Sequence, residues 1–242
     1  MRSARSYLLC GTPRTGSTLL CSLLSSTGVA GQPESYFREP DRRRWASRFG
    51  LGVTDEDDVN DVDFVRAVVR AGSTGNGVFA ARIMWGTMHR LVEGLRSHIG
   101  AHRDVDVLES ALGPLRFVHL ERSDVVAQAV SWARAEQTGF WQQGDRSDAT
   151  AELDLDQVER LVATVHEHNE AWRTWFAAQD VEPLRLTYES LASSPVETVT
   201  RVLDFVGTTR PVDWAPVSPP ERQADSLNAE WVHRYRATRR GN

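Results

Sequence analysis

The segment that decides the fold runs Ser6-Tyr7-Leu8-Leu9-Cys10-Gly11-Thr12-Pro13-Arg14-Thr15-Gly16-Ser17-Thr18. Its first part, residues 6–10, is a short apolar run that is typical of a buried parallel strand. A loop containing glycine, proline and threonine follows. Residues 17–27 then place leucines at helical spacing, and Gly28 is well placed to end that helix. The segment therefore predicts a strand, a tight loop and a helix in immediate succession.

The loop from Gly11 to Thr18 has the spacing Gly-x4-Gly-x-Thr of a phosphate-binding loop. In such a loop, consecutive backbone N–H groups and the helix N-terminus face an anion. Ser17 stands where a nucleoside triphosphatase has its lysine, and a cation is supplied earlier in the loop by Arg14. The alternative is an ordinary strand-to-helix turn that binds nothing.

The strand-and-helix unit recurs along the chain. Further strands are predicted at 78–84, 115–120 and 184–188, and helices at 87–99, 123–137, 155–178, 195–206 and 228–239. This alternation predicts an α/β fold, a P-loop-like parallel sheet flanked by helices on both faces. We expect a single domain over residues 1–242. The turn-rich residues 72–77, the acidic residues 55–58 and the Pro-rich stretch 208–225 are predicted to be loops.

The composition excludes several classes of protein. All 28 basic residues are arginine, so Schiff-base and pyridoxal chemistry, which need a lysine, are excluded. The net charge of −5 argues against nucleic-acid binding. Cys10 and Cys21 are too few for a disulfide framework or a common zinc site, and are predicted to be buried thiols. No apolar run approaches the roughly 20 residues of a membrane span or the core of a signal peptide, so we expect a cytoplasmic protein.

Several motifs in order resemble one family over nearly the whole chain. They are the loop 12–20 and the stretches 27–33, 83–85, 121–131, 172–176, 181–183, 221–225 and 230–236. The chain resembles the bacterial trehalose 2-sulfotransferase family, with relatives described as lipopolysaccharide or nodulation-factor sulfotransferases. These enzymes use 3′-phosphoadenosine 5′-phosphosulfate (PAPS). The resemblance implies PAPS as co-substrate, and nothing in the sequence signals a metal.

The resemblance also implies roles for individual residues. The 5′-phosphosulfate loop would comprise Pro13, Arg14, Thr15, Gly16, Ser17 and Thr18. Arg122 and Ser131 would bind the 3′-phosphate, because a guanidinium matches phosphate oxygens two at a time. A segment with Arg222 and Gln223 would fold over the nucleotide. The alternatives are an Arg122 that caps or salt-bridges the following helix and an exposed loop arginine at 222.

The catalytic base is the point of departure from the family. The family motif Gly-x-Pro-x-Glu-aromatic-Phe corresponds here to Gly31–Phe37, which places Ser35 at the glutamate position and Glu34 one residue earlier. Arg14 is the candidate that stabilises the leaving group, and Glu34 is our preferred base. Glu39, Asp41 and His89 are the other candidates. The remaining histidines, His119 among them, are predicted to be surface or satisfied core side chains, and Trp172 and Trp175 core.

The predicted activity is in-line transfer of a sulfuryl group from PAPS to a hydroxyl of a carbohydrate or glycoconjugate. The alternatives are a nucleotide kinase-like P-loop protein and a non-catalytic PAPS-binding relative. A homodimer is possible, through the C-terminal helix or residues 36–65. The run Arg42–Arg44 either meets an anionic acceptor or is a solvated surface.

Overall fold

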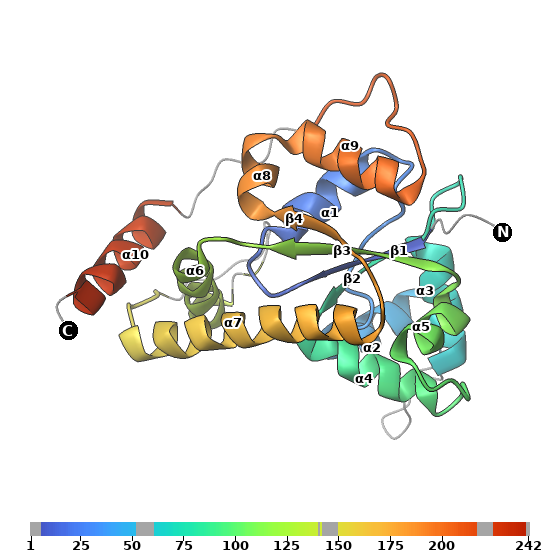
Figure 1. Cartoon of the computed structure of the whole chain (residues 1–242), viewed down its shortest axis with the longest axis horizontal. Coiled ribbons are helices and arrows are strands. Elements are labelled where there is room, and N and C mark those ends of the chain that lie inside the picture. Colours follow the sequence, from blue (N-terminus) through green and yellow to red (C-terminus); the bar gives the residue numbers. More distant parts are fainter. Residues whose placement is uncertain (1–5, 52–60, 140, 142–149, 217–224, 241–242) are drawn as a thin grey trace.

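The computed structural model describes residues 6–51, 61–139, 141, 150–216 and 225–240. Four strands form one parallel sheet in the order β2-β1-β3-β4 (Figure 1). They are β1 (Ser6–Gly11), β2 (Ala80–Met84), β3 (Leu115–Glu121) and β4 (Leu184–Thr187). The predicted α/β fold with a parallel sheet is confirmed, and the four predicted strands lie where the sequence put them.

Helices cover both faces of the sheet. Those that the sequence predicted are α1 (Ser17–Ser26), α4 (Trp85–Arg96), α6 (Val125–Thr138), α7 (Leu155–Ala178), α9 (Pro195–Val206) and α10 (Asp225–Arg240). Four more were not predicted: α2 (Glu39–Arg48), α3 (Asp61–Gly72), α5 (Asp104–Leu112) and α8 (Tyr188–Ser193). In α2 the charged residues hide the helical period, and α8 is too short to show one.

Gly72 was predicted to start a turn but is the last residue of α3. A Cβ at this position would lie 2.6 Å from the Phe79 ring and 2.9 Å from the Ala80 carbonyl oxygen. The glycine is therefore required by close helix–strand packing, which a sequence pattern of turn residues cannot distinguish from a turn.

Alternating side chains of β1 pack in two separate hydrophobic clusters, one on each face of the sheet. Tyr7 and Leu9 pack in a cluster with α1, α8 and α9, whereas Leu8 and Cys10 pack with α2–α5 and α7 on the other face (Figure 1). Both cysteines are buried and free, as predicted. Burial raises the pKa of the Cys21 thiol to about 12, so it packs as a small apolar side chain.

The C-terminal helix α10 closes a third cluster. Trp231 and Tyr235, one turn apart, are buried against α6 and α7, which confirms the predicted amphipathic helix. An ion pair between Arg236 and Asp124 (2.7 Å) joins α10 to the start of α6. This contact holds α10 beside the start of α6, the helix that follows β3.

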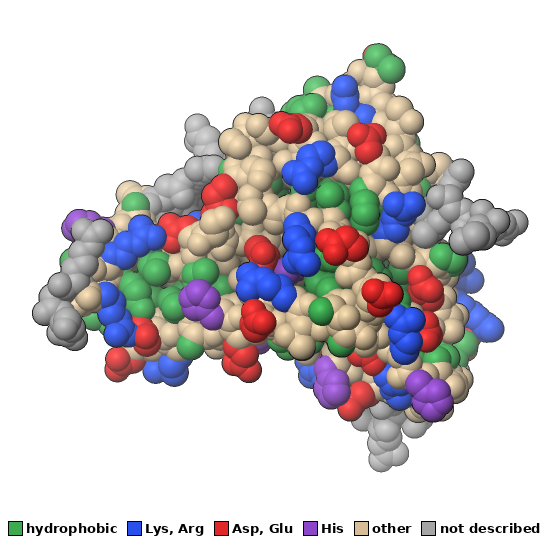
Figure 2. Space-filling view, in the orientation of Figure 1, with side chains coloured by type: hydrophobic (Ala, Val, Ile, Leu, Met, Phe, Trp, Pro, Cys, Tyr) green, Lys and Arg blue, Asp and Glu red, His purple; other side chains and the backbone are tan. Residues whose placement is uncertain are grey.

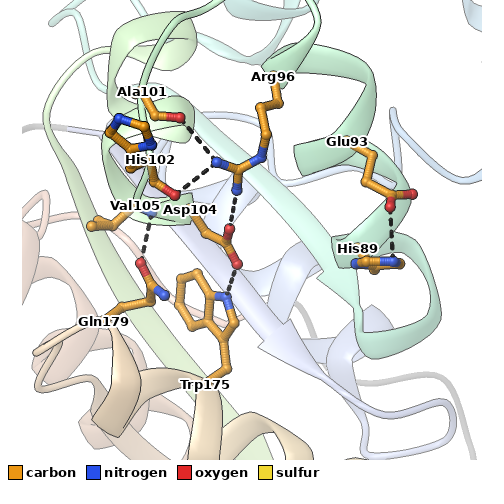
Figure 3. Close-up of polar contacts among 9 residues, drawn as sticks. All are labelled: His89, Glu93, Arg96, Ala101, His102, Asp104, Val105, Trp175 and Gln179. Carbon is orange, nitrogen blue, oxygen red and sulfur yellow. Dashed lines mark hydrogen bonds and ion pairs between the residues drawn. The ribbon is translucent and has the colours of Figure 1, made fainter.

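A polar network fixes the connection between α4 and α5 (Figure 3). Arg96 donates to the carbonyl oxygens of Ala101 and His102 and pairs with Asp104. The other oxygen of Asp104 accepts from the indole Nε1 of Trp175 on α7 at 2.8 Å. The network is structural, because each of its donors and acceptors holds a neighbouring helix or turn.

No helix in the part of the chain that the structure describes is long and apolar enough to cross a membrane.

Candidate active site

The loop between β1 and α1 has an unusual backbone. Arg14 has φ +68° and Gly16 has φ +82°, both in the left-handed region. A Cβ at Gly16 would lie 2.5 Å from Cδ2 of Tyr188, so the ring of Tyr188 packs directly on the loop. Arginine is rare at such φ values, and its presence here marks a conformation that the surroundings must impose.

Buried contacts from helices α6 and α7 impose this backbone conformation on the loop. Buried side chains hold the loop through hydrogen bonds from Gln128 Nε2 to the Pro13 carbonyl (2.8 Å), from Trp172 Nε1 to the Gly11 carbonyl (2.9 Å), and from Thr12 Oγ1 to Asn169 Oδ1 (3.1 Å). The donors and acceptors come from α6 and α7, and the side chains of Thr12, Gln128 and Trp172 are fully buried. The loop is therefore fixed before any ligand arrives.

The loop offers several hydrogen-bond donors to an anion. The N–H groups in the first turn of any helix have no intrahelical acceptor, and in α1, which begins at Ser17, the N-cap Gly16 has no side chain to accept from them either. The hydroxyl of Thr15 is buried and has no hydrogen-bond partner among the described residues. The guanidinium of Arg14 is placed by Ser131 Oγ (2.9 Å from Nε) and by the Trp141 carbonyl (2.6 Å from an Nη). This donor set fits a phosphosulfate group.

Arg122 follows β3 directly, at the carboxyl edge of the sheet. Its guanidinium lies 4.5 Å from the centre of the Tyr188 ring, and its Nε has no hydrogen-bond partner within the described ranges. Ser131, the predicted second 3′-phosphate residue, instead accepts from Arg14. The cap of α6 is made by Asp124, which accepts from the Ala127 amide. Arg122 is thus neither the cap nor an ion-pair partner in the resolved contacts, and its role toward a 3′-phosphate stays a prediction.

A cleft of about 590 Å³ opens in front of the loop. Its lining is Pro13, Arg14, Ser17, Thr18, Glu34, Ser35, Arg38, Asp41, Arg44, Trp45, Arg48, Arg82, Met84, Gly139 and Trp141. Six of these are predicted site residues from two separate segments, 13–18 and 34–35. The fold brings them together because Arg82 of β2 donates its amide to the Glu34 carbonyl at 2.9 Å, which lays this segment beside the sheet.

Arg82 also links the two segments through its side chain. Its Nε donates to Ser35 Oγ at 2.8 Å and one Nη donates to Thr18 Oγ1 at 2.9 Å. Ser35, at the family's glutamate position, is therefore an acceptor for Arg82. The sequence did not single out this role.

Glu34 is the best placed of the candidate bases. Glu34 and Asp41 line the cleft, whereas Glu39 and His89 do not. His89 is exposed on α4 and pairs with Glu93 at 3.1 Å (Figure 3). Asp41 is engaged by Arg38 and Arg44. The side chain of Glu34 makes no hydrogen bond or ion pair with the residues that are described, so its carboxylate is available to a substrate.

The prediction that the other histidines are surface or satisfied core side chains is wrong for His119. This side chain of β3 is fully buried among Trp172 and Phe176, and neither ring nitrogen has a partner in the described structure. Burial, with smaller contributions from Arg185 and Arg173, lowers its pKa to about 3, so the ring is neutral. Trp172 and Trp175 are core, as predicted.

Several residues that hold the loop in place were not predicted from the sequence. Gln128, Asn169, Trp172 and Tyr188 fix the loop, and Arg82 bridges it to Ser35. Gln128 lies inside a stretch that carries the family resemblance, which is the signal that could have drawn attention to it.

Arg222 and Gln223 lie outside the described residues. Among the described residues, no group of three or more His, Cys, Asp or Glu side chains is arranged to hold a metal ion.

A model described as Stf0 sulphotransferase matches residues 6–238, from β1 into α10. The chain belongs to the Stf0 sulphotransferase family. PAPS is the typical co-substrate of sulfotransferases, which agrees with the donor set of the loop. Membership also sets aside the kinase-like alternative.

Two curated relatives are 32% identical to the chain. Both are trehalose 2-sulfotransferases, one from Mycobacterium tuberculosis (strain Erdman) and one from Mycolicibacterium smegmatis. The alignments cover 98% of this chain and 96% of the first protein, and 95% and 94% for the second. Among solved structures, a sulfotransferase from Alicyclobacillus acidocaldarius is 14% identical, with 96% of this chain and 94% of that chain covered and a TM-score of 0.45.

Proposed function

We propose that the protein transfers a sulfuryl group from PAPS to a hydroxyl of a carbohydrate or glycoconjugate. The observation that carries the proposal is the single cleft in which the phosphate loop, Arg14 and the carboxylate of Glu34 meet. The two relatives named for trehalose, a disaccharide, support a sugar acceptor.

In this proposal the loop residues bind and polarise the donor. PAPS, when bound, supplies the sulfuryl group, and adenosine 3′,5′-bisphosphate leaves. Arg14 and the N–H groups at the start of α1 stabilise the negative charge that grows on the leaving phosphate oxygen. Because these donors are already fixed by buried contacts, they need little reorganisation when the charge develops.

Glu34 acts as the general base. It accepts the proton of the acceptor hydroxyl as the new oxygen–sulfur bond forms and the bond from sulfur to the bridging oxygen breaks. Ser35 is not a base at neutral pH. Its hydroxyl holds Arg82, which in turn holds Thr18 in the loop. Arg122, near Tyr188, is the candidate for the 3′-phosphate.

The test is a transfer assay with PAPS and a panel of sugars that includes trehalose, read by mass spectrometry as an added sulfate. We expect a sulfated sugar and release of adenosine 3′,5′-bisphosphate. A parallel thermal-shift titration should show stabilisation by that bisphosphate, without magnesium, in preference to ATP. Binding of the bisphosphate without transfer to any acceptor would establish a non-catalytic relative instead.

A further inference from the structure

One wall of the cleft is made by helix α2 and is strongly basic. Arg38, at the start of this helix, and Arg44 and Arg48 within it line the cleft together with Asp41 and Trp45. The loop that is proposed to hold the nucleotide lies on a different segment, residues 13–18. The basic groups of α2 are therefore additional to the donors of the loop.

The carboxylate on this wall does not neutralise the arginines. Asp41 is shared by Arg38, at 2.6 Å, and by Arg44, at 3.4 Å. Two guanidinium groups thus share one carboxylate, which leaves one positive charge in excess. On the outer face seen in Figure 2, by contrast, basic and acidic side chains are interspersed.

Arg48 adds a second excess charge. Its guanidinium lies 4.8 Å from the centre of the Trp45 ring, and Trp45 stacks on Phe49 at 5.7 Å. This stacking orients the guanidinium and leaves its N–H groups without a carboxylate, because Arg48 has no ion pair or hydrogen bond with the described residues. A stacked guanidinium with unused donors is well suited to bind an anion.

The Trp45 ring, in turn, is a poor platform for a neutral sugar. Phe49, Arg48 and Tyr36 (ring centres 4.9 Å apart) already pack on it. The α2 wall therefore presents guanidinium groups, and not an aromatic face, to a substrate.

We infer that the acceptor carries an anionic substituent, a carboxylate or a phosphate, which Arg48 and the Arg38–Asp41–Arg44 group bind on the α2 wall. This inference rests on the proposed function, since it names the acceptor of the same transfer. Guanidinium groups match the oxygens of both anions two at a time. A basic wall beside a cleft also raises the local concentration of an anionic substrate.

The experiment compares three acceptors of the same size with saturating PAPS. They are a disaccharide with a uronic acid, a disaccharide phosphate, and neutral trehalose. We expect kcat/KM for at least one of the two anionic acceptors to exceed that for trehalose by about tenfold or more, as a hydrogen-bonded charged group typically contributes. The better of the two identifies carboxylate or phosphate.

Two variants test the wall itself. Arg48→Gln and Arg44→Gln should each raise KM for the anionic acceptor by about tenfold, while the Kd for adenosine 3′,5′-bisphosphate changes less than about twofold. Arg43→Gln is the matched control, because Arg43 is exposed on the same helix and does not line the cleft. It should leave both constants unchanged.

The outcomes separate this inference from the proposed function. Efficient transfer to trehalose, with anionic acceptors no better, overturns the inference and leaves the proposed function standing. A parallel loss of bisphosphate affinity in Arg48→Gln also overturns it, because the wall would then serve the nucleotide. No transfer to any acceptor overturns the proposed function. If a variant fails to fold, the salt dependence of the unmodified protein decides. Added salt should lower kcat/KM for the anionic acceptor and not for trehalose; equal salt dependence contradicts the inference.

Discussion

The two walls of the cleft are built in opposite ways. The loop from Gly11 to Thr18 is held by buried hydrogen bonds to Gln128, Asn169 and Trp172. Helix α2 packs on the core through Ala46 and Trp45, but its cleft-lining arginines are exposed and are positioned by ion pairs to Asp41 and by the stacking of Arg48. Exposed ion pairs contribute only about 0–1 kcal/mol to stability. Substitutions on α2 should therefore report on ligand binding, whereas substitutions beneath the loop also report on folding.

The largest effect is expected from Arg14. Arg14→Gln removes the loop cation and should lower kcat by about 10²–10³-fold, as loss of one electrostatic donor to a developing charge typically does. Steady-state transfer from PAPS measures it. Arg43→Gln on α2 is the control, since that arginine does not line the cleft. If kcat of Arg14→Gln fell by less than about threefold, Arg14 in the loop would not differ in catalytic importance from the arginines of α2.

Glu34 lines the same cleft as the loop and α2. Glu34→Gln should lower kcat by about 100-fold, because the amide cannot accept the hydroxyl proton, with little change in affinity for adenosine 3′,5′-bisphosphate. Asp41→Asn is the comparison variant. Asp41 is engaged by two arginines, so this change should alter the acceptor KM more than kcat. Near-normal turnover of Glu34→Gln would remove it as the base.

Gly16 tests how rigid the loop wall is. Gly16→Ala places a Cβ against Tyr188 at a position with φ +82°, so the ring or the loop must shift. We expect the conformation that the loop has in this structure to become less favourable by about 1–2 kcal/mol. The affinity for adenosine 3′,5′-bisphosphate, measured by thermal-shift titration, should therefore fall about tenfold. Gly50→Ala is the control, because it has a similar φ of +70° but open space around its Cβ. Equal affinities for the two variants would show that the Tyr188 contact does not position the loop.

The smallest effect on activity is expected beneath the loop, at His119. His119→Leu should leave turnover within about twofold and raise the free energy of unfolding by about 1–3 kcal/mol, because it removes unpaired buried polar atoms. Denaturant unfolding measures the change.

His119→Leu should also change how the stability of the protein depends on pH. The pKa of His119 is about 3 when folded, below its ordinary value of 6.5. The unfolded chain therefore takes up this proton first, and stability that is present above pH 6.5 is lost as the pH falls toward 3. His119→Leu should unfold less readily in this window. If His119→Leu and the unmodified protein unfolded at the same acidic pH, the conclusion that the buried His119 ring is neutral and has no partner would be wrong.

The secondary structure was predictable where local patterns are strong. The apolar run of β1, the loop spacing and the leucines of α1 depend on residues within one segment, and all three lie where predicted. Helix α2 was missed because its arginines and sparse apolar residues resemble a solvated run. Packing of the buried Ala46 and the partly buried Trp45 against the core stabilises it as a helix, and that is a tertiary effect.

The sequence alone determined the α/β fold and the strand, loop and helix at residues 6–26, and it predicted a phosphate loop with Arg14 as its cation, because these follow from local patterns in a chain without lysine. Only the tertiary structure decided which distant side chains meet that loop. Arg82 joins Ser35 to Thr18, and Arg38, Arg44 and Arg48 gather in the same cleft as Glu34. Such contacts depend on strand order and helix packing, which place residues tens of positions apart side by side. No local pattern encodes them.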